Sequence, residues 1–205
     1  MSTPDPQAVR RGRRQLLALA ALFFVPLALA FWMYYGPTGW QPSGDASKGD
    51  LIDPARPLPE IGLPAMDGGT TAPSFLRGKW TMLYVGDGLC DDACRRALYL
   101  TRQSRIALNK DMDRVQRVFL VTGRCCDRSF LAKEHPDLIV ALVEDAPSAA
   151  VLGPFPTYGG VPVAAAGRIY LVDPLGNLMM SYAPTAPEKA LLTDMKKLLR
   201  LSHIG

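Results

Sequence analysis

The pattern of hydrophobic and polar positions divides the chain into three parts. Residues 16–35 form an apolar run without a charged side chain. Residues 36–58 are rich in Gly, Pro, Ser and Asp and show no periodicity. From residue 59 onward, short apolar runs alternate with segments of helical period. The pattern therefore predicts a transmembrane anchor at 16–35, a flexible linker at 36–58 and one folded domain at 59–205.

The apolar run contains 20 residues, which is enough to cross a hydrocarbon core about 30 Å thick. Four arginines stand directly before it: Arg10, Arg11, Arg13 and Arg14. Because arginines stay on the cytoplasmic side, residues 1–15 are expected to be a cytoplasmic N-terminus and the domain to lie outside. This predicts a single-pass protein of the inner (plasma) membrane with a periplasmic C-terminal domain.

Two other readings of the N-terminus remain open. Ala28-Leu29-Ala30 fits a signal-peptide cleavage site, and Arg13-Arg14 fits a twin-arginine export signal faintly. Each reading exports the same domain to an oxidising compartment. Cysteine pairs have redox meaning there.

Within the domain, five short apolar runs read as strands, at residues 80–85, 115–122, 138–143, 168–173 and 178–182. Helices are predicted at residues 91–109 and 130–134 and from a capping-box spacing at Thr185. The last of these has an apolar face of Leu191, Leu192, Met195, Leu198 and Leu199. A strand-helix-strand unit forces parallel pairing, and Pro174-Leu175-Gly176-Asn177 indicates an antiparallel hairpin. The predicted fold is α/β, with a thioredoxin-like mixed sheet flanked by helices.

Composition narrows the functional classes. The chain has 205 residues, 48% of them hydrophobic and 20% charged, which suits one globular domain with an appendage. Four cysteines are too few for a disulfide-dense small protein. The net charge of +4 comes mostly from the N-terminal arginines, so no nucleic-acid partner is expected. The sequence has no nucleotide-binding glycine loop, hydrolase triad or zinc motif.

The candidate chemistry lies in Cys90 and Cys94. This pair falls where the first strand of the domain ends and its helix begins. A spacing of i,i+4 places both sulfurs on one helical face, and the positive end of the helix dipole favours a thiolate. The pair can close a disulfide or bind a soft cation such as Cu(I). Asp91 and Asp92 oppose an adjacent thiolate but do not hinder a cation.

These cysteines, together with Val121-Thr122 and Tyr170-Leu171-Val172-Asp173-Pro174-Leu175-Gly176, give the chain a resemblance to the Sco/SenC family over residues 59–200. That family consists of membrane-anchored cytochrome c oxidase assembly factors. The resemblance implies a thioredoxin-like fold, a role in maturing the copper centre of the oxidase, and copper binding through two Cys and one His. It carries Cys90 and Cys94 over as both redox and metal-binding residues. The implied partner is the copper-receiving subunit of the oxidase or another periplasmic thiol protein.

The chain departs from that family in two ways. Asp91 and Arg95 stand where prolines usually flank the cysteines, and Ala165 stands where the family has its copper-binding His. His135, at an expected helix end, is read as a surface residue, and His203 lies in the tail. The resemblance therefore supports the two cysteines but not the complete copper site.

A second cysteine pair, Cys125 and Cys126, follows the strand at residues 115–122. Because neighbouring parallel strands end at the same edge of a sheet, we expect one of these cysteines to approach Cys90 and Cys94. It would act as a third soft ligand or as a resolving thiol. An exposed bystander pair is the competing reading.

Three functions follow as hypotheses. The first is a Sco-like assembly factor that reduces client cysteines, hands over Cu(I), or does both. In the redox chemistry, Cys90 is expected to be the more exposed thiol and to attack, and Cys94 to resolve the mixed disulfide. The second is a general periplasmic thiol-disulfide oxidoreductase. The third is a non-catalytic module that keeps the fold and provides a docking surface. A purely structural disulfide is the competing reading of Cys90 and Cys94. The arginines Arg95, Arg96, Arg102 and Arg105 are read as a solvated helix face.

Overall fold

The computed structural model describes residues 6–36, 47–202 and 204. The chain divides into two compact units, with the boundary between Ala46 and Ser47. Each unit is described by itself below. Residues 37–46 of the linker expected at 36–58 lie outside the described residues, as does His203.

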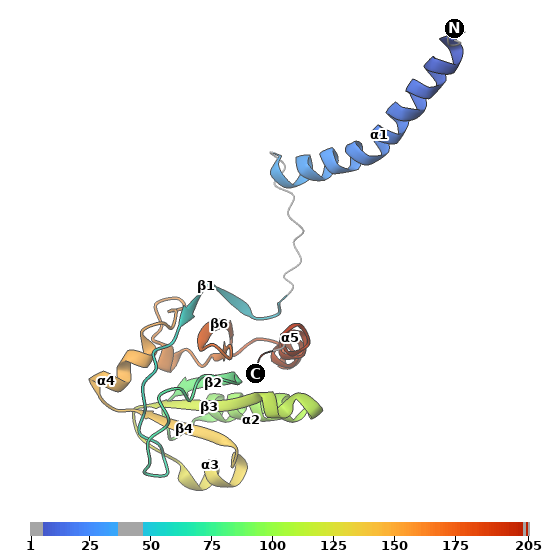
Figure 1. Cartoon of the computed structure of the whole chain (residues 1–205). Coiled ribbons are helices and arrows are strands. Elements are labelled where there is room, and N and C mark those ends of the chain that lie inside the picture. Colours follow the sequence, from blue (N-terminus) through green and yellow to red (C-terminus); the bar gives the residue numbers. More distant parts are fainter. Residues whose placement is uncertain (1–5, 37–46, 203, 205) are drawn as a thin grey trace. The chain divides into compact units, whose positions relative to one another are not determined.

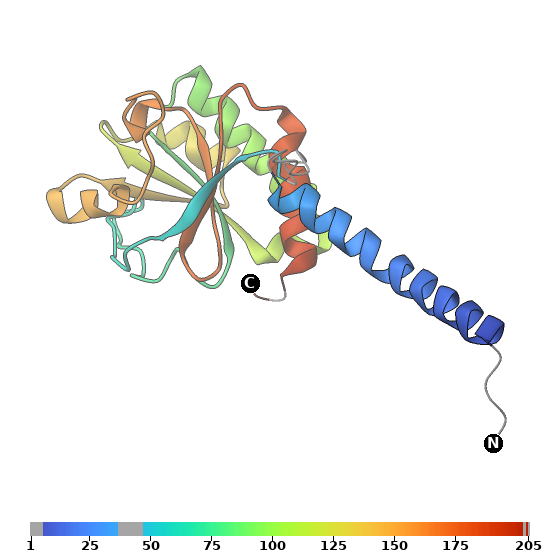
Figure 2. The same ribbon diagram turned by 90° about the horizontal axis from the view of Figure 1, so that it is seen from above.

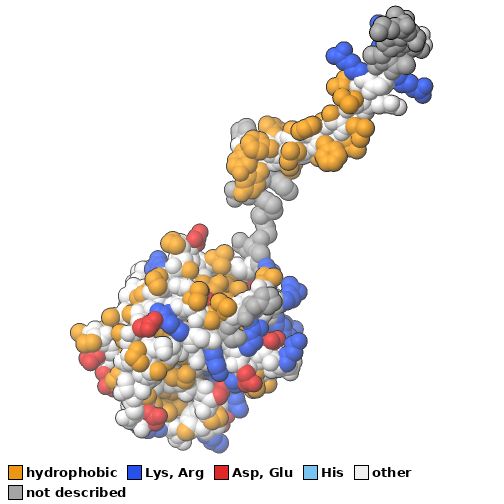
Figure 3. All heavy atoms as spheres, in the orientation of Figure 1, with side chains coloured by type: hydrophobic (Ala, Val, Ile, Leu, Met, Phe, Trp, Pro, Cys, Tyr) orange, Lys and Arg blue, Asp and Glu red, His pale blue; other side chains and the backbone are white. Residues whose placement is uncertain are grey.

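The first unit is the helix α1, Pro6–Tyr35, with Pro26 inside it. It begins ten residues before the predicted anchor because the arginine-rich segment is helical as well. Figure 3 shows hydrophobic side chains along the helix and Lys or Arg side chains near its N-terminal end. Over Arg10–Tyr35 the helix is long and apolar enough to cross a membrane. A signal sequence has the same properties, so the two readings remain alternatives.

The second unit is built on a six-stranded sheet in the order β1-β6-β5-β2-β3-β4. The strands are β1 Asp50–Pro57, β2 Trp80–Gly86, β3 Val115–Thr122, β4 Leu138–Val143, β5 Ile169–Val172 and β6 Asn177–Tyr182. The α-helices of this unit are α2 Asp92–Ile106, α3 Arg128–Glu134, α4 Ala146–Ala149 and α5 Glu188–Leu201. Short 3-10 helices are η1 Asn109–Arg114, η2 Ala150–Leu152 and η3 Val163–Ala165. Figure 1 labels most of these elements.

The sheet is mixed, as predicted. Strand β2 pairs in parallel with β3, and β3 pairs in parallel with β4. On its other side β2 pairs antiparallel with β5, which forms an antiparallel pair with β6. The carboxyl ends of β2 and β3 therefore lie side by side, which determines where the cysteines meet.

Two hydrophobic clusters cover the two faces of the sheet. Along β2, Met82 and Tyr84 belong to one cluster and Leu83 and Val85 to the other, since successive strand residues point to opposite faces. The first cluster is closed by residues of α2, α3 and α5. In Figure 2, α2 (green) and α5 (red) lie near each other beside the sheet, and the two helices are in contact. The cysteine pair belongs to this first cluster.

The strand β1 corrects the predicted linker. Residues 50–57 were expected to be flexible, yet they pair antiparallel with β6 at the sheet edge. Prolines are tolerated on an edge strand, and here the strand buries Ile52 alone, so its sequence carries no alternating pattern. The backbone N–H groups of Lys48 and Gly49 donate to Asp194 Oδ2 at 2.7 and 3.0 Å. These bonds attach the start of the strand to α5.

The last helix also differs from the prediction in one respect. Helix α5 begins at Glu188 after Pro187, without a side-chain cap, so the capping box expected from Thr185 is wrong. Its predicted apolar face is confirmed, since Leu191, Met195 and Leu199 are buried in the core.

Candidate functional site

Cys90 and Cys94 form a disulfide at the junction of β2 and α2, with 5.0 Å between their Cα atoms. The chain leaves β2 at Gly86 and turns, with the Cys90 N–H donating to the Asp87 carbonyl at 3.1 Å. Cys90 has a φ of 51°, in the left-handed region that non-glycine residues seldom adopt. Because Cys94 lies in the first turn of α2, the sulfurs sit at the positive end of the helix.

Asp91 fixes the start of α2. Its Oδ1 atom accepts a hydrogen bond from the Cys94 backbone N–H at 2.9 Å, which makes Asp91 the N-cap. The pKa of Tyr84 is raised to about 12, first by the burial of Tyr84 and then by the negative charge of this carboxylate. Asp91 therefore places a negative charge beside the cysteine pair as well as capping the helix.

The disulfide faces an open pocket of about 380 Å³. Cys90 and Cys94 are only 2% and 3% exposed, but both line this pocket. Its other walls include Tyr84, Asp87, Leu89, Arg124, Ala164 and Ala165. The expectation that Cys90 is the more exposed thiol is wrong, because the turn at residues 87–90 folds Cys90 into the core beside Cys94.

The loop after β3 lies directly against this turn. The Asp127 N–H donates to the Gly88 carbonyl at 3.0 Å. A Cβ atom on Gly88 would stand 2.5 Å from the Arg124 carbonyl oxygen and 3.1 Å from the Cys125 Cα. The two loops approach so closely that only glycine fits at position 88.

Cys125 and Cys126 form a disulfide with each other, with their Cα atoms 3.2 Å apart. Cys125 is exposed and Cys126 is partly buried against the cluster that holds Cys90 and Cys94. The parallel strands thus bring the two loops together, as the topology indicated. The four sulfurs are divided between two separate disulfides.

Arg95 connects the two loops, which corrects its assignment to a solvated face. Its Nε donates to the Cys90 carbonyl at 3.1 Å and its Nη2 to Asp127 at 2.9 Å. Its guanidinium also lies 4.0 Å from the centre of the Phe130 ring. The sequence did not indicate these contacts of Arg95, because Asp127 and Phe130 lie in a distant segment of the chain.

Two more of these arginines have partners. Arg105 donates to the Val115 carbonyl at 2.7 Å, and Arg102 lies 3.7 Å from Glu134. The solvated reading fits Arg96, which is exposed. The expected arginine face is therefore mostly a set of contacts to neighbouring segments.

His135 is buried, at 4% exposure, so its assignment to the surface is wrong. The Nη2 atom of the fully buried Arg117 donates to His135 Nδ1 at 3.2 Å. Burial and the Arg117 charge lower the pKa of His135 to about 4. Arg117 was the missed signal, since an arginine inside a buried strand needs polar partners within the core. His135 does not line the cysteine pocket.

The residues of the pocket do not complete a copper site. Ala165 lines the same pocket as Cys90 and Cys94, and its methyl group cannot ligate a metal. Within residues 6–36, 47–202 and 204, no group of three or more His, Cys, Asp or Glu side chains is placed to hold an ion. Among the described residues that line this pocket, no histidine and no further cysteine joins the two sulfurs.

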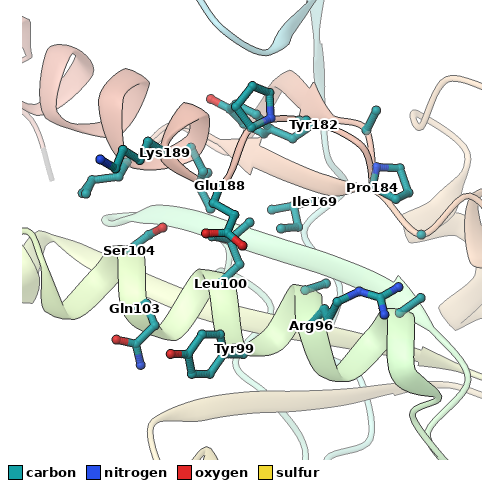
Figure 4. A pocket seen from close by; sticks show the side chains of 18 of the residues that line it. Arg96, Tyr99, Leu100, Gln103, Ser104, Ile169, Tyr182, Pro184, Glu188 and Lys189 are labelled. Atoms are coloured by element: carbon teal, nitrogen blue, oxygen red, sulfur yellow. The ribbon is translucent and has the colours of Figure 1, made fainter.

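A second hollow of about 450 Å³ adjoins the cysteine pocket between α2 and α5, and it was not predicted from the sequence. Figure 4 shows Tyr99, Leu100 and Ile169 among the side chains around it, with Arg96 and Glu188. It shares Ala93 and Gly167 with the cysteine pocket. No cysteine or histidine is among the described residues that line it.

The fold and the paired cysteines define a thioredoxin-like protein with an apolar N-terminal helix. Residues 80–202 match the family described as "Transmembrane-like, thioredoxin-like, C-terminal domain", and residues 6–37 match "Transmembrane-like, N-terminal domain". Since the first match covers more than half of the chain, the chain belongs to this family of transmembrane-like, thioredoxin-like proteins. The apolar helix and the family's N-terminal domain together support membrane anchoring.

Several solved structures share the fold. Copper-bound ScoI of Bradyrhizobium japonicum is 22% identical with a TM-score of 0.54, covering 70% of this chain and 99% of its own. Copper-bound Sco1 of yeast is 18% identical with a TM-score of 0.59, covering 74% and 96%. A putative protein disulfide isomerase of Bacteroides thetaiotaomicron is 19% identical with a TM-score of 0.54, covering 75% and 94%. These likenesses confirm a Sco-like thioredoxin fold. No curated protein sequence matches the chain.

Proposed function

We propose that the chain is a membrane-anchored periplasmic protein of Sco/SenC type that performs thiol-disulfide exchange on cysteines of the copper-receiving subunit of cytochrome c oxidase. The observation that carries this proposal is the disulfide between Cys90 and Cys94, four residues apart in sequence. This disulfide faces an open pocket at the carboxyl edge of the sheet. The four arginines before the apolar helix support a cytoplasmic N-terminus in the inner membrane.

The reaction begins with the reduced pair. A thiolate of the pair attacks one sulfur of a client disulfide, and the other client sulfur leaves as a thiolate that takes a proton. The second cysteine of the pair then attacks the mixed disulfide. The products are a client dithiol and the Cys90–Cys94 disulfide, so two electrons and two protons pass to the client.

Cys90 is the proposed nucleophile because it lies in the turn before α2, whereas Cys94 is held within the helix. The pair's equal burial means that this assignment rests on position alone. Arg95 holds the Cys90 carbonyl and so fixes the attacking residue from its backbone side.

Copper(I) handling is the second candidate function. The likeness to copper-bound Sco structures and the two adjacent sulfurs favour it. Against a resident three-ligand site, the pocket offers Ala165 in place of a third donor. Copper would then be a cargo bound by two thiolates and passed on, in the manner of a copper chaperone.

A general periplasmic oxidoreductase and a non-catalytic docking module are the competing functions. The likeness to a putative disulfide isomerase favours the first of these. A Cys90→Ser/Cys94→Ser variant discriminates among all four functions in a strain that lacks the wild-type protein. Immunoblotting verifies its abundance, and the wild-type chain serves as the control.

Under our proposal the variant loses cytochrome c oxidase activity, and an added small thiol restores that activity. Restoration by added copper would instead support copper delivery. Normal oxidase assembly with a disulfide defect in other periplasmic proteins would favour the general oxidoreductase. Full oxidase activity without any such defect would favour the docking module and overturn the proposal.

A further inference from the structure

We infer that Cys125–Cys126 is a second redox site, which takes an electron pair from a protein dithiol at the surface and passes it to Cys90–Cys94. This inference rests on the proposed exchange function and adds to it the route by which the inner pair is reduced again. The class of substrate at the second site is a reduced protein dithiol.

The first argument is the contrast in exposure between the two pairs. Cys90 and Cys94 are almost fully buried and are reached through a pocket, whereas Cys125 is exposed. A protein dithiol would have to reach Cys90 and Cys94 through a pocket of about 380 Å³. The second pair is therefore the more accessible of the two to a folded protein.

The second argument is the contact between the two loops. Asp127, the residue after Cys126, donates its N–H to the carbonyl of Gly88, two residues before Cys90. Gly88 lies against the backbone of Arg124 and Cys125, where no side chain would fit. Cys126 packs against the same core cluster as Cys90 and Cys94. The turn that carries Cys90 and the loop that carries Cys125 and Cys126 are therefore in direct backbone contact.

The third argument is charge. Arg124 directly precedes Cys125, and its side chain is 77% exposed, with its Nε 3.6 Å from Asp87 Oδ2. A cation beside a cysteine favours the thiolate, which is the attacking species in exchange. Arg95 reaches both Cys90 and the loop of the second pair, because it bonds the Cys90 carbonyl and Asp127. Arg124 and Arg95 therefore place two guanidinium groups at the contact between the two loops, where Arg124 pairs with Asp87 and Arg95 with Asp127.

The transfer takes place in two balanced exchanges. The external dithiol reduces Cys125–Cys126 and becomes a disulfide itself. A thiolate of the vicinal pair then attacks Cys90–Cys94, the displaced thiolate takes a proton, and the remaining vicinal thiol resolves the mixed disulfide. Cys125–Cys126 is re-formed and Cys90/Cys94 becomes a dithiol. Two electrons and two protons move inward in each cycle.

The mixed disulfide can be trapped in the full-length chain in detergent micelles. Two variants are compared, Cys94→Ser/Cys125→Ser and Cys94→Ser/Cys126→Ser, each of which keeps Cys90 and one cysteine of the second pair. After mild oxidation with diamide at low protein concentration, peptide mapping is expected to find an intramolecular disulfide between those two cysteines in at least one variant. Adding Gly88→Ala is expected to slow its formation because the new Cβ separates the loops. If both variants give only free thiols or cross-linked dimers, the inference is overturned.

A kinetic test uses reduced bacterial thioredoxin as the protein dithiol. Oxidised wild-type chain and a Cys125→Ser/Cys126→Ser variant are mixed with it, and alkylation with mass spectrometry follows the reduction of Cys90–Cys94. We expect the variant to react about tenfold more slowly or worse, while dithiothreitol, a small dithiol, reduces both chains at similar rates. Equal rates with thioredoxin would overturn the inference.

One further measurement separates this inference from the proposed function. The same variant, reduced beforehand with dithiothreitol and desalted, is given a short cyclic peptide disulfide. Reduction of the peptide at the wild-type rate shows that Cys90 and Cys94 exchange without the second pair. Failure of both chains to reduce the peptide would contradict the proposed function, whereas failure of the thioredoxin arm alone contradicts only the relay.

Discussion

Arg95 donates a hydrogen bond from Nε to the backbone carbonyl of Cys90, across 3.1 Å. The guanidinium is planar and carries several donors, so its Nη2 can donate to Asp127 at 2.9 Å while Nε donates to the Cys90 carbonyl. One side chain on α2 thereby ties together the turn after β2 and the loop after β3. These are the two segments that carry the four cysteines.

Replacing Arg95 by Gln is expected to loosen the turn that carries Cys90. Because the side chain is 42% exposed, solvent weakens the lost bonds, and we expect the free energy of unfolding to fall by about 1 kcal/mol. Exchange with a peptide disulfide should slow as well. Urea unfolding and the exchange rate measure the two effects. The exposed neighbour Arg96→Gln serves as the control and should change neither; equal effects at both positions would contradict the positioning role of Arg95.

Asp91 has two effects that a pair of substitutions can separate. Asp91→Ser keeps an oxygen to accept from the Cys94 N–H but removes the charge, so the thiolate fraction of the reduced pair should increase. Iodoacetamide should then alkylate the reduced protein faster at neutral pH. Asp91→Ala also removes the cap and should lower the free energy of unfolding by about 1 kcal/mol. An unchanged alkylation rate in Asp91→Ser would show that this charge does not restrain the thiols.

The buried pair of His135 and Arg117 makes stability depend on pH. Burial, and then the charges of Arg117 and Arg102, lower the pKa of His135 from 6.5 to about 4, against the opposing charges of Asp137 and Glu134. Between these two values the unfolded chain binds a proton that the folded chain does not, so stability falls as the pH falls through this window. From pH 7 to pH 5 the loss from this residue should be about 2 kcal/mol.

Urea unfolding of the solubilised chain at several pH values measures this loss. His135→Gln offers Arg117 an oxygen acceptor and cannot titrate. Between pH 7 and pH 5, the free energy of unfolding of this variant should therefore fall by about 2 kcal/mol less than that of the wild-type chain. A wild-type slope equal to that of the variant would mean that His135 is protonated at the same pH in both states.

Ala165 provides a gain-of-function test of the copper hypothesis. Its side chain lines the pocket of Cys90 and Cys94, so Ala165→His would add an imidazole to the two sulfurs. We expect the anaerobic Cu(I) affinity of the reduced chain to rise on the order of tenfold or more. Ala166→His is the matched control, because Ala166 does not line this pocket. The same affinity in both variants would show that the pocket does not direct position 165 at the sulfurs.

Much of the fold could be predicted because its signals are local. The apolar run of β2 and the helical period of α2 place Cys90 and Cys94 at a strand-to-helix junction, and the strand-helix-strand order places β3 in parallel beside β2. Neither step needs any side-chain contact between distant residues. The parallel strands likewise bring the loop of Cys125 to the turn of Cys90.

The errors come from contacts between distant residues. Strand β1 is held by β6 and by Asp194, more than a hundred residues later, while its own sequence reads as a linker. The burial of His135 depends on Arg117, and that of Cys90 on the direction of a tight turn. Burial of a polar side chain is decided by its partner, and a partner far along the chain leaves no periodic trace.

Gly88 is the residue at which the two cysteine-bearing loops pack backbone against backbone. With the backbones of two loops packed against each other at this residue, neither loop can shift without pressing on its neighbour. Opening or closing a disulfide in one loop changes the space that its backbone occupies. Any such change in one loop meets the backbone of the other loop at Gly88, so this glycine is the point where the two cysteine pairs are sterically linked.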